Sequence, residues 1–164
     1  MRTKIIILLA LFVLAILNYG IYEKEQIKKK GEIVLLKLAP VDPRSLMQGD
    51  YMRLRYTLES EILSQAGGNH QKRGYVVVRP DKNNVAQFVR IYQNEKMVAG
   101  EKLFRYYNQT YSIRIVPDSF LFQEGQAQLY QEAKYGIFKF SGQKDYLLVG
   151  LANADREEIG PPGH

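Results

Sequence analysis

The sequence predicts an α+β protein in which one N-terminal transmembrane helix precedes a mainly antiparallel β domain of about eight short strands and one or two helices. Three observations predict this architecture. An uncharged apolar run fills residues 5–21, short apolar or alternating segments recur through the rest of the chain, and turn signals separate those segments. We therefore divide the chain into a membrane anchor (1–22), a polar stalk (23–31) and one β-rich domain (32–160).

The apolar run is the first element. It reads IIILLALFVLAILNYGI, and Asn18 is its one strongly polar member. A helix that spans a bilayer needs about 20 apolar residues, with a lower limit near 17, so this run is long enough only at the short end of that range. A cleaved secretory signal is the alternative, but residues 17–20 read LNYG and lack the A-x-A pattern of a cleavage site. We expect a retained anchor that contacts membrane lipid through residues 5–21.

The positive charges on the two flanks of the anchor are nearly balanced, so the short N-terminal tail predicts the orientation. Only four residues precede the apolar run, which is typical of a signal-anchor that leaves the following domain outside the cytoplasm.

Residues 22–31 read YEKEQIKKKG, a polar stalk that we expect to continue the helix until Gly31 ends it.

Most of the net charge belongs to the anchor and its flanks. Residues 1–30 carry six basic and two acidic residues, so they supply +4 of the formal net charge of +6, and the domain keeps only +2. Lys and Arg beside an anchor suit lipid headgroups. This balance argues against nucleic-acid binding.

The absence of cysteine excludes a disulfide scaffold and a thiol nucleophile.

The domain is expected to consist mainly of strands joined as hairpins. The expected strands are 33–38, 51–58, 75–79, 85–92, 103–107, 111–116, 137–140 and 146–151, and the expected helices are 59–66 and 125–134. Phe120, Leu121 and Phe122 are expected to lie in the core.

The block PVDPRSLMQGDYMRLRY at residues 40–56 is the richest in chemistry. Asp50 follows Gly49 in a turn, where its carboxylate can accept backbone N–H groups. Alternation then puts Tyr51, Arg53 and Arg55 on one face of a strand, an arrangement suited to a carboxylate, a phosphate or an anionic headgroup. The alternative is that these side chains only cover the solvent-exposed face of a sheet and bind no ligand.

Other familiar sites have no support in the sequence. Histidine occurs only at His70 and His164, and no glycine-rich phosphate loop is present. We therefore predict no metal site and no cofactor.

The motif in this block resembles a known family. Residues Gly49-Asp50-Tyr51-Met52-Arg53-Leu54-Arg55-Tyr56 match the GDYXXLXY signature at every fixed position. The likeness extends to 40–44, 74–77, 120–127, 135–136 and 148–151. The chain therefore resembles the GDYXXLXY family of bacterial membrane-anchored proteins. This resemblance implies an anchor in the bacterial inner membrane, a domain facing the periplasm and no established catalytic activity.

A vaguer likeness supports an enzymatic alternative. The segment around Ser45 is similar to the nucleophile segment of the serine–lysine signal peptidases, but the order here is Ser-Leu-Met and the following proline is missing. Lys96 and Lys102 are at a tolerable distance to act as the base, although polar residues flank each of them. Ser45 is thus the fallback catalytic residue of an envelope hydrolase.

A second enzymatic alternative is a cluster of Asp42, Asp50 and Glu124, three carboxylates in segments that carry the resemblance. The simpler interpretation of Glu124 is that it stabilises the start of the expected 125–134 helix.

The favoured function is a binding or assembly module that is anchored in the membrane and has another envelope or membrane protein as its partner. The predicted motif and binding residues are Asp42, Gly49, Asp50, Tyr51, Arg53, Leu54, Arg55, Tyr56, Glu124 and Gly125.

Overall fold

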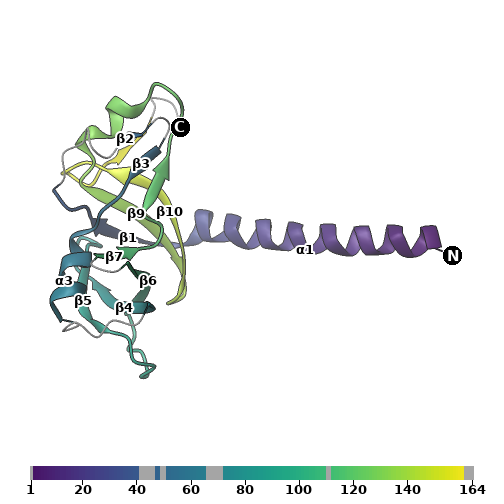
Figure 1. Cartoon of the computed structure of the whole chain (residues 1–164), viewed down its shortest axis with the longest axis horizontal. Coiled ribbons are helices and arrows are strands. Elements are labelled where there is room, and N and C mark those ends of the chain that lie inside the picture. Colours follow the sequence, from purple (N-terminus) through teal and green to yellow (C-terminus); the bar gives the residue numbers. More distant parts are fainter. Residues whose placement is uncertain (1, 41–46, 49–50, 66–71, 110–111, 161–164) are drawn as a thin grey trace.

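The computed structural model describes residues 2–40, 47–48, 51–65, 72–109 and 112–160. One long helix projects from a body of small sheets (Figure 1). The prediction of a mainly antiparallel α+β domain behind one apolar helix is confirmed.

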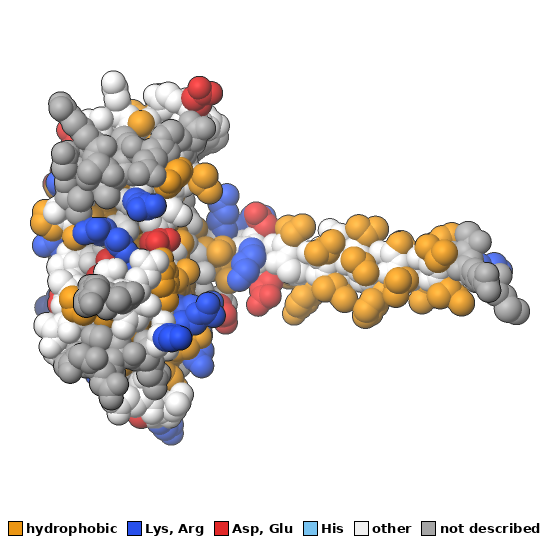
Figure 2. Space-filling model, viewed as in Figure 1, with side chains coloured by type: hydrophobic (Ala, Val, Ile, Leu, Met, Phe, Trp, Pro, Cys, Tyr) orange, Lys and Arg blue, Asp and Glu red, His pale blue; other side chains and the backbone are white. Residues whose placement is uncertain are grey.

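The long helix α1 (Arg2–Lys30) is unbroken and includes the predicted stalk. Its segment Lys4–Lys30 is long and apolar enough to cross a membrane. Hydrophobic side chains cover the projecting part of the helix, and charged side chains gather where it meets the body (Figure 2). The helix ends as predicted at Gly31, whose N–H donates to the carbonyl of Ile27 at 2.8 Å.

The base of α1 is fixed to the domain. Ile27 is buried, and the Nζ atom of Lys139 donates to the carbonyl of Lys28 at 2.6 Å. A Cβ atom on Gly31 would lie 2.9 Å from the Cβ of Lys139, so only glycine allows this close approach. Packing and a hydrogen bond therefore connect the base of the helix to the first sheet.

The strands form three antiparallel sheets. The first has the order β1-β9-β10-β11, with β1 (Glu32–Lys37), β9 (Tyr135–Ser141), β10 (Asp145–Ala152) and β11 (Glu158–Ile159). The second has the order β2-β3-β8, with β2 (Met47–Gln48), β3 (Tyr51–Arg53) and β8 (Ser119–Leu121). The third has the order β5-β4-β6-β7, with β4 (Arg73–Pro80), β5 (Ala86–Ile91), β6 (Lys102–Gln109) and β7 (Ser112–Ile115). A parallel bridge between Leu35 and Val85 joins the first sheet to the third.

The sheets and the helix α3 (Thr57–Gln65) share one core. Its centre is aromatic: the ring of Phe104 lies 4.8 Å from that of Phe138, 5.2 Å from Phe140 and 5.0 Å from Tyr146, measured between centroids. Such tilted and edge-to-face pairs stabilise a core beyond their buried area.

The predicted hairpins β4-β5, β6-β7 and β9-β10 are confirmed by antiparallel pairing. The predicted helix at 59–66 is confirmed by α3. Strands β2, β8 and β11 were not predicted. Each is two or three residues long, which is too short for alternation to be recognised.

Two expected elements are wrong in detail. The strand expected at 51–58 ends at Arg53, and α3 begins at Thr57. The helix expected at 125–134 is instead a short 3₁₀ helix, η1 (Ala127–Glu132). Leu121, expected in the core, is 77% exposed, because its neighbours Phe120 and Phe122 turn toward Tyr130 and leave it on the outer face.

Candidate binding groove at the motif strand

The fixed residues of the motif that the structure describes build the fold. Leu54 and Tyr56 are almost completely buried. The N–H of Leu54 donates to the carbonyl of Asp118, and the hydroxyl of Tyr56 donates to the carbonyl of Pro117, both at 2.8 Å. These bonds hold the segment between β3 and α3 against the chain that leads into β8. The buried residues of the motif therefore have a structural role.

Two of the three variable positions of the motif, Arg53 and Arg55, are exposed, whereas the third, Met52, is buried. Both arginines line a groove of about 330 Å³ that lies between the end of β1, residues 52–57 and the end of η1. Its walls also carry Lys37 and Lys134, and its floor includes Leu38, Met52, Leu54 and Ala133. We call this the motif groove.

Backbone hydrogen bonds bring these segments together. The N–H of Ala39 donates to the carbonyl of Arg55 at 2.8 Å, so the chain after β1 lies beside the motif. The N–H of Leu38 donates to the carbonyl of Lys134 at 2.8 Å and thereby continues the pairing of β1 with β9. The groove is thus shaped by main-chain bonds, and its four cationic side chains are exposed.

The motif groove is strongly basic. The described part of its lining contains Lys37, Arg53, Arg55 and Lys134 and no Asp or Glu. Within the described part of the chain, none of these four side chains forms an ion pair. Arginine donates in a fork that matches a carboxylate, and a groove lined by one sign of charge attracts the opposite sign. Its chemistry therefore suits an acidic ligand.

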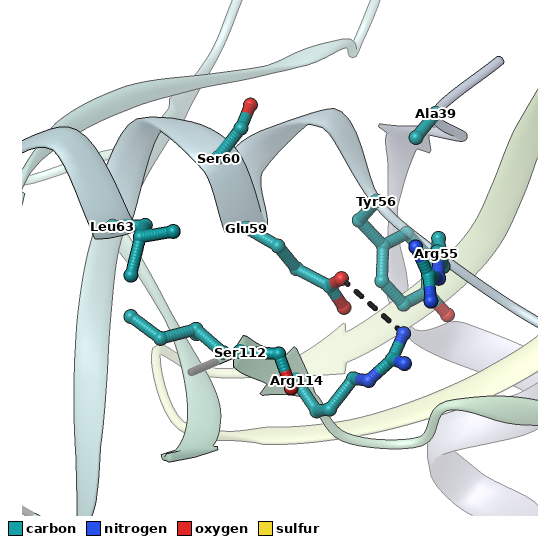
Figure 3. Close-up of a pocket in the computed structure, with 9 residues that line it drawn as sticks. Ala39, Arg55, Tyr56, Glu59, Ser60, Leu63, Ser112 and Arg114 are labelled. Carbon is teal, nitrogen blue, oxygen red and sulfur yellow. Dashed lines mark ion pairs between the residues drawn. The ribbon is translucent and has the colours of Figure 1, made fainter. Parts of the chain in front are cut away.

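A smaller cavity of about 210 Å³ adjoins the motif groove, since Arg55 and Ala39 line both. In Figure 3, Glu59 of α3 points into this cavity toward Arg114 of β7. The Oε1 atom of Glu59 accepts the N–H of Ile115 at 3.1 Å, and its Oε2 atom lies 3.8 Å from Nη1 of Arg114. This carboxyl joins α3 to the edge of the third sheet.

Burial dominates the electrostatics of Glu59. It raises the pKa of this carboxyl from 4.5 to about 7, although the N–H of Ile115 and the charges of Arg114 and Arg55 act in the opposite direction. Near neutral pH, Glu59 therefore exists in both protonation states, and the net charge of the cavity depends on pH.

Glu59 is not among the residues predicted for the site, although its position in the sequence carries a signal. Glu59 lies three residues before Ile62, next to Leu58, so helical periodicity puts it on the buried face of α3. Lys37 and Lys134 were also missed. They lie together only because of the β1–β9 pairing, which no local pattern specifies.

The structure brings some of the predicted site residues together and separates others. Arg53 and Arg55 share the motif groove, but Tyr51 does not line it; Tyr51 is half-buried in β3, opposite Leu121. Glu124 and Gly125 form an exposed turn away from the groove lining, and Gly125 has a φ of 80°.

Several predicted residues, Asp42, Ser45, Gly49 and Asp50, lie outside the described residues. Of the two lysines weighed as partners of Ser45, Lys96 is exposed and Lys102 is buried. The Nζ atom of Lys102 lies 2.6 Å from the carboxylate of Glu32 and donates to the carbonyl of Gly142. Lys102 is therefore a buried ion-pair partner that joins β6 to the first sheet.

The most strongly paired charges of the described chain also have a structural role. Glu101 is 1% exposed, and Arg90 donates to both of its carboxylate oxygens at 2.7 and 3.0 Å. The hydrogen bonds from Arg90 hold the pKa of Glu101 down to about 2. Arg90 also donates to Glu95 at 2.6 Å, so this network fixes the segment between β5 and β6. Among the described residues, no group of three or more His, Cys, Asp or Glu side chains could hold a metal ion.

Together, the fold and the groove define a class of protein: a β-rich domain with a basic groove, attached to one apolar helix. The family model described as GDYXXLXY protein matches residues 13–151, from within α1 to β10, and the chain belongs to this family. No curated protein and no solved structure matches the chain.

Proposed function

We propose that this protein is a membrane-anchored module that binds another envelope or membrane protein outside the cytoplasm through the motif groove. The observation that carries the proposal is the set of four cations, Lys37, Arg53, Arg55 and Lys134, around an apolar floor, with no acidic residue among the described residues of the lining. An acidic segment of the partner would supply the missing charge. The alternative is a hydrolase built on Ser45 or on Asp42, Asp50 and Glu124, and of these residues only Glu124 is among those that the structure describes.

The test removes the two arginines together. We expect Arg53→Ala with Arg55→Ala to weaken the complex about 30-fold or more, because truncating a central interface anchor costs about 2 kcal/mol. The measurement is recovery of the complex from native membranes. Lys82→Ala with Lys96→Ala is the matched control, since it removes two exposed lysines outside the groove, and it should leave recovery unchanged.

The same assay separates the module from the hydrolase. We expect Ser45→Ala to retain both complex recovery and the cellular phenotype. A Ser45→Ala protein that folds but is inactive in cells, together with a double arginine variant that recovers the complex normally, would contradict the proposal and favour the hydrolase.

A separate prediction concerns topology. The helix is apolar enough to span a membrane and lacks an A-x-A site, so we expect the anchor to be retained and the domain to face outward. N-terminal sequencing of the mature protein should find the anchor, and a reporter that is active only outside the cytoplasm, fused after Gly163, should be active. A mature chain that begins near Ile21, or a silent reporter on a well-expressed fusion, would show the topology to be wrong.

A further inference from the structure

A cavity of about 540 Å³ opens at the base of α1. It shares no lining residue with the motif groove. Its apolar wall includes Ile33 of β1, Ile137 of β9 and Val149 of β10. Ile33 is 43% exposed, which gives the cavity an accessible apolar surface. We call it the juxtamembrane cavity.

The other wall of the juxtamembrane cavity is cationic. Lys28 of α1, Lys139 of β9 and Arg156 of the β10–β11 loop line it, and Glu158 is the one carboxylate among the described lining residues, which together carry a net charge of +2. The carboxylate of Glu158 lies against Gly150, where a Cβ atom would be only 2.7 Å from Oε1.

Each cation keeps donors for a ligand. Lys139 gives one N–H to the carbonyl of Lys28, but an ammonium carries three. Lys28 and Arg156 form no ion pair with a carboxylate of the described chain. The cavity therefore offers several charge-assisted donors to an anion beside an apolar wall.

The position of the cavity favours an occupant from the membrane. Lys28 is seven residues beyond Ile21, the end of the apolar run, which corresponds to about 10 Å along a helix. The headgroup region extends about 5–8 Å beyond the hydrocarbon core, so lysine and arginine side chains at that height reach lipid phosphates. Ile27, Gly31 and Lys139 connect the base of α1 to the first sheet, and Lys28 itself lines the cavity, so the cavity lies at this height.

We propose that the juxtamembrane cavity binds the headgroup of an anionic phospholipid from the surrounding membrane. The phosphate lies between Lys28, Lys139 and Arg156, and the glycerol region contacts Ile33. This inference rests on the anchor in the proposed function and is independent of partner binding in the motif groove.

The experiment uses the full chain in micelles of a neutral detergent, titrated with phosphatidylglycerol or phosphatidylcholine, and measures retained lipid by native mass spectrometry. We expect selective retention of phosphatidylglycerol. Lys28→Gln with Arg156→Asn should weaken it about 30-fold, since each cation near an anionic surface contributes about 1 kcal/mol. Asparagine is chosen because residue 156 has a φ of 69°, which asparagine tolerates well.

The control variant, Lys24→Gln with Lys29→Gln, removes two charges from the same helix outside the cavity and should change affinity less than about twofold. If the first double variant unfolds at a lower urea concentration, the single variant Lys28→Gln is used instead. Its affinity for phosphatidylglycerol is expected to fall about fivefold. Arg53→Ala with Arg55→Ala should bind the lipid normally, which keeps this site distinct from the motif groove.

Three results would overturn the lipid site. They are an equal loss in the control variant, equal retention of phosphatidylcholine, and displacement of the lipid by inorganic phosphate at the same concentration, which would indicate a site for soluble anions.

Discussion

Replacing Tyr56 by alanine is expected to lower the free energy of unfolding by about 3–5 kcal/mol, the range for deleting a large buried ring. Tyr56 is 1% exposed, and its ring centroid lies 6.0 Å from that of Phe138. Its backbone pairs with Leu38, and its hydroxyl donates to the carbonyl of Pro117 at 2.8 Å. The substitution thus leaves a cavity and also an unsatisfied carbonyl.

The measurement is urea unfolding of the full chain in neutral detergent, followed by near-UV circular dichroism of the tyrosines. Tyr56→Phe keeps the ring and loses only the hydrogen bond, so it should cost about 1 kcal/mol. Arg55→Ala, next to it but exposed, should cost less than about 0.5 kcal/mol. If Tyr56→Ala unfolds at the wild-type urea concentration and yet loses function, the motif tyrosine is functional and its structural role is refuted.

Glu59→Gln is expected to stabilise the domain above pH 7 by about 2–3 kcal/mol. The pKa of Glu59 is raised from 4.5 to about 7 by burial, so the folded chain binds more protons than the unfolded chain between those values. The contribution of Glu59 to the free energy of unfolding therefore falls as the pH rises from about 4.5 to about 7, and it is constant above pH 7. Glutamine keeps the acceptor for the N–H of Ile115 and has no charge to desolvate.

The midpoint of urea unfolding, measured at intervals from about pH 4.5 to pH 8, checks this expectation. Glu61→Gln is the matched control, because Glu61 is exposed on the same helix and should leave the pH profile unchanged. A Glu59→Gln profile that declines as steeply as the wild type, or a wild-type stability that rises across this window, would be inconsistent with a buried carboxyl that resists ionisation.

The elements that the sequence predicts well are those with strong local signals. The apolar run and Gly31 predict the extent of α1, and turn residues such as those of 81–84 predict the hairpins. Alternation from Met52 to Leu58 predicts burial correctly even where it predicts the wrong element. Leu54 and Tyr56 reach the core by a short extended segment, and Leu58 reaches it from a helix. Alternation of apolar and polar residues therefore predicts which side chains are buried, but it does not predict whether the backbone forms a strand or a helix.

The candidate sites were harder to predict because they depend on packing. Arg53 and Arg55 stand out in the motif, but Lys37 and Lys134 join them only through the β1–β9 register. The raised pKa of Glu59 requires α3 to pack on β7, which local sequence does not specify. The juxtamembrane cavity likewise combines α1, β9 and the β10–β11 loop, segments that are far apart in the chain.

Partner binding through the motif groove is tested most directly by photo-crosslinking in native membranes. A photo-crosslinking amino acid is placed at Arg53 in the groove or, as control, at the exposed Lys82 outside it. We expect a protein adduct from position 53 that disappears when Arg55→Glu and Lys134→Glu reverse the charge of the groove, and no such adduct from position 82. An adduct that persists after this charge reversal, or one that forms at position 82 and not at position 53, would contradict binding in the motif groove.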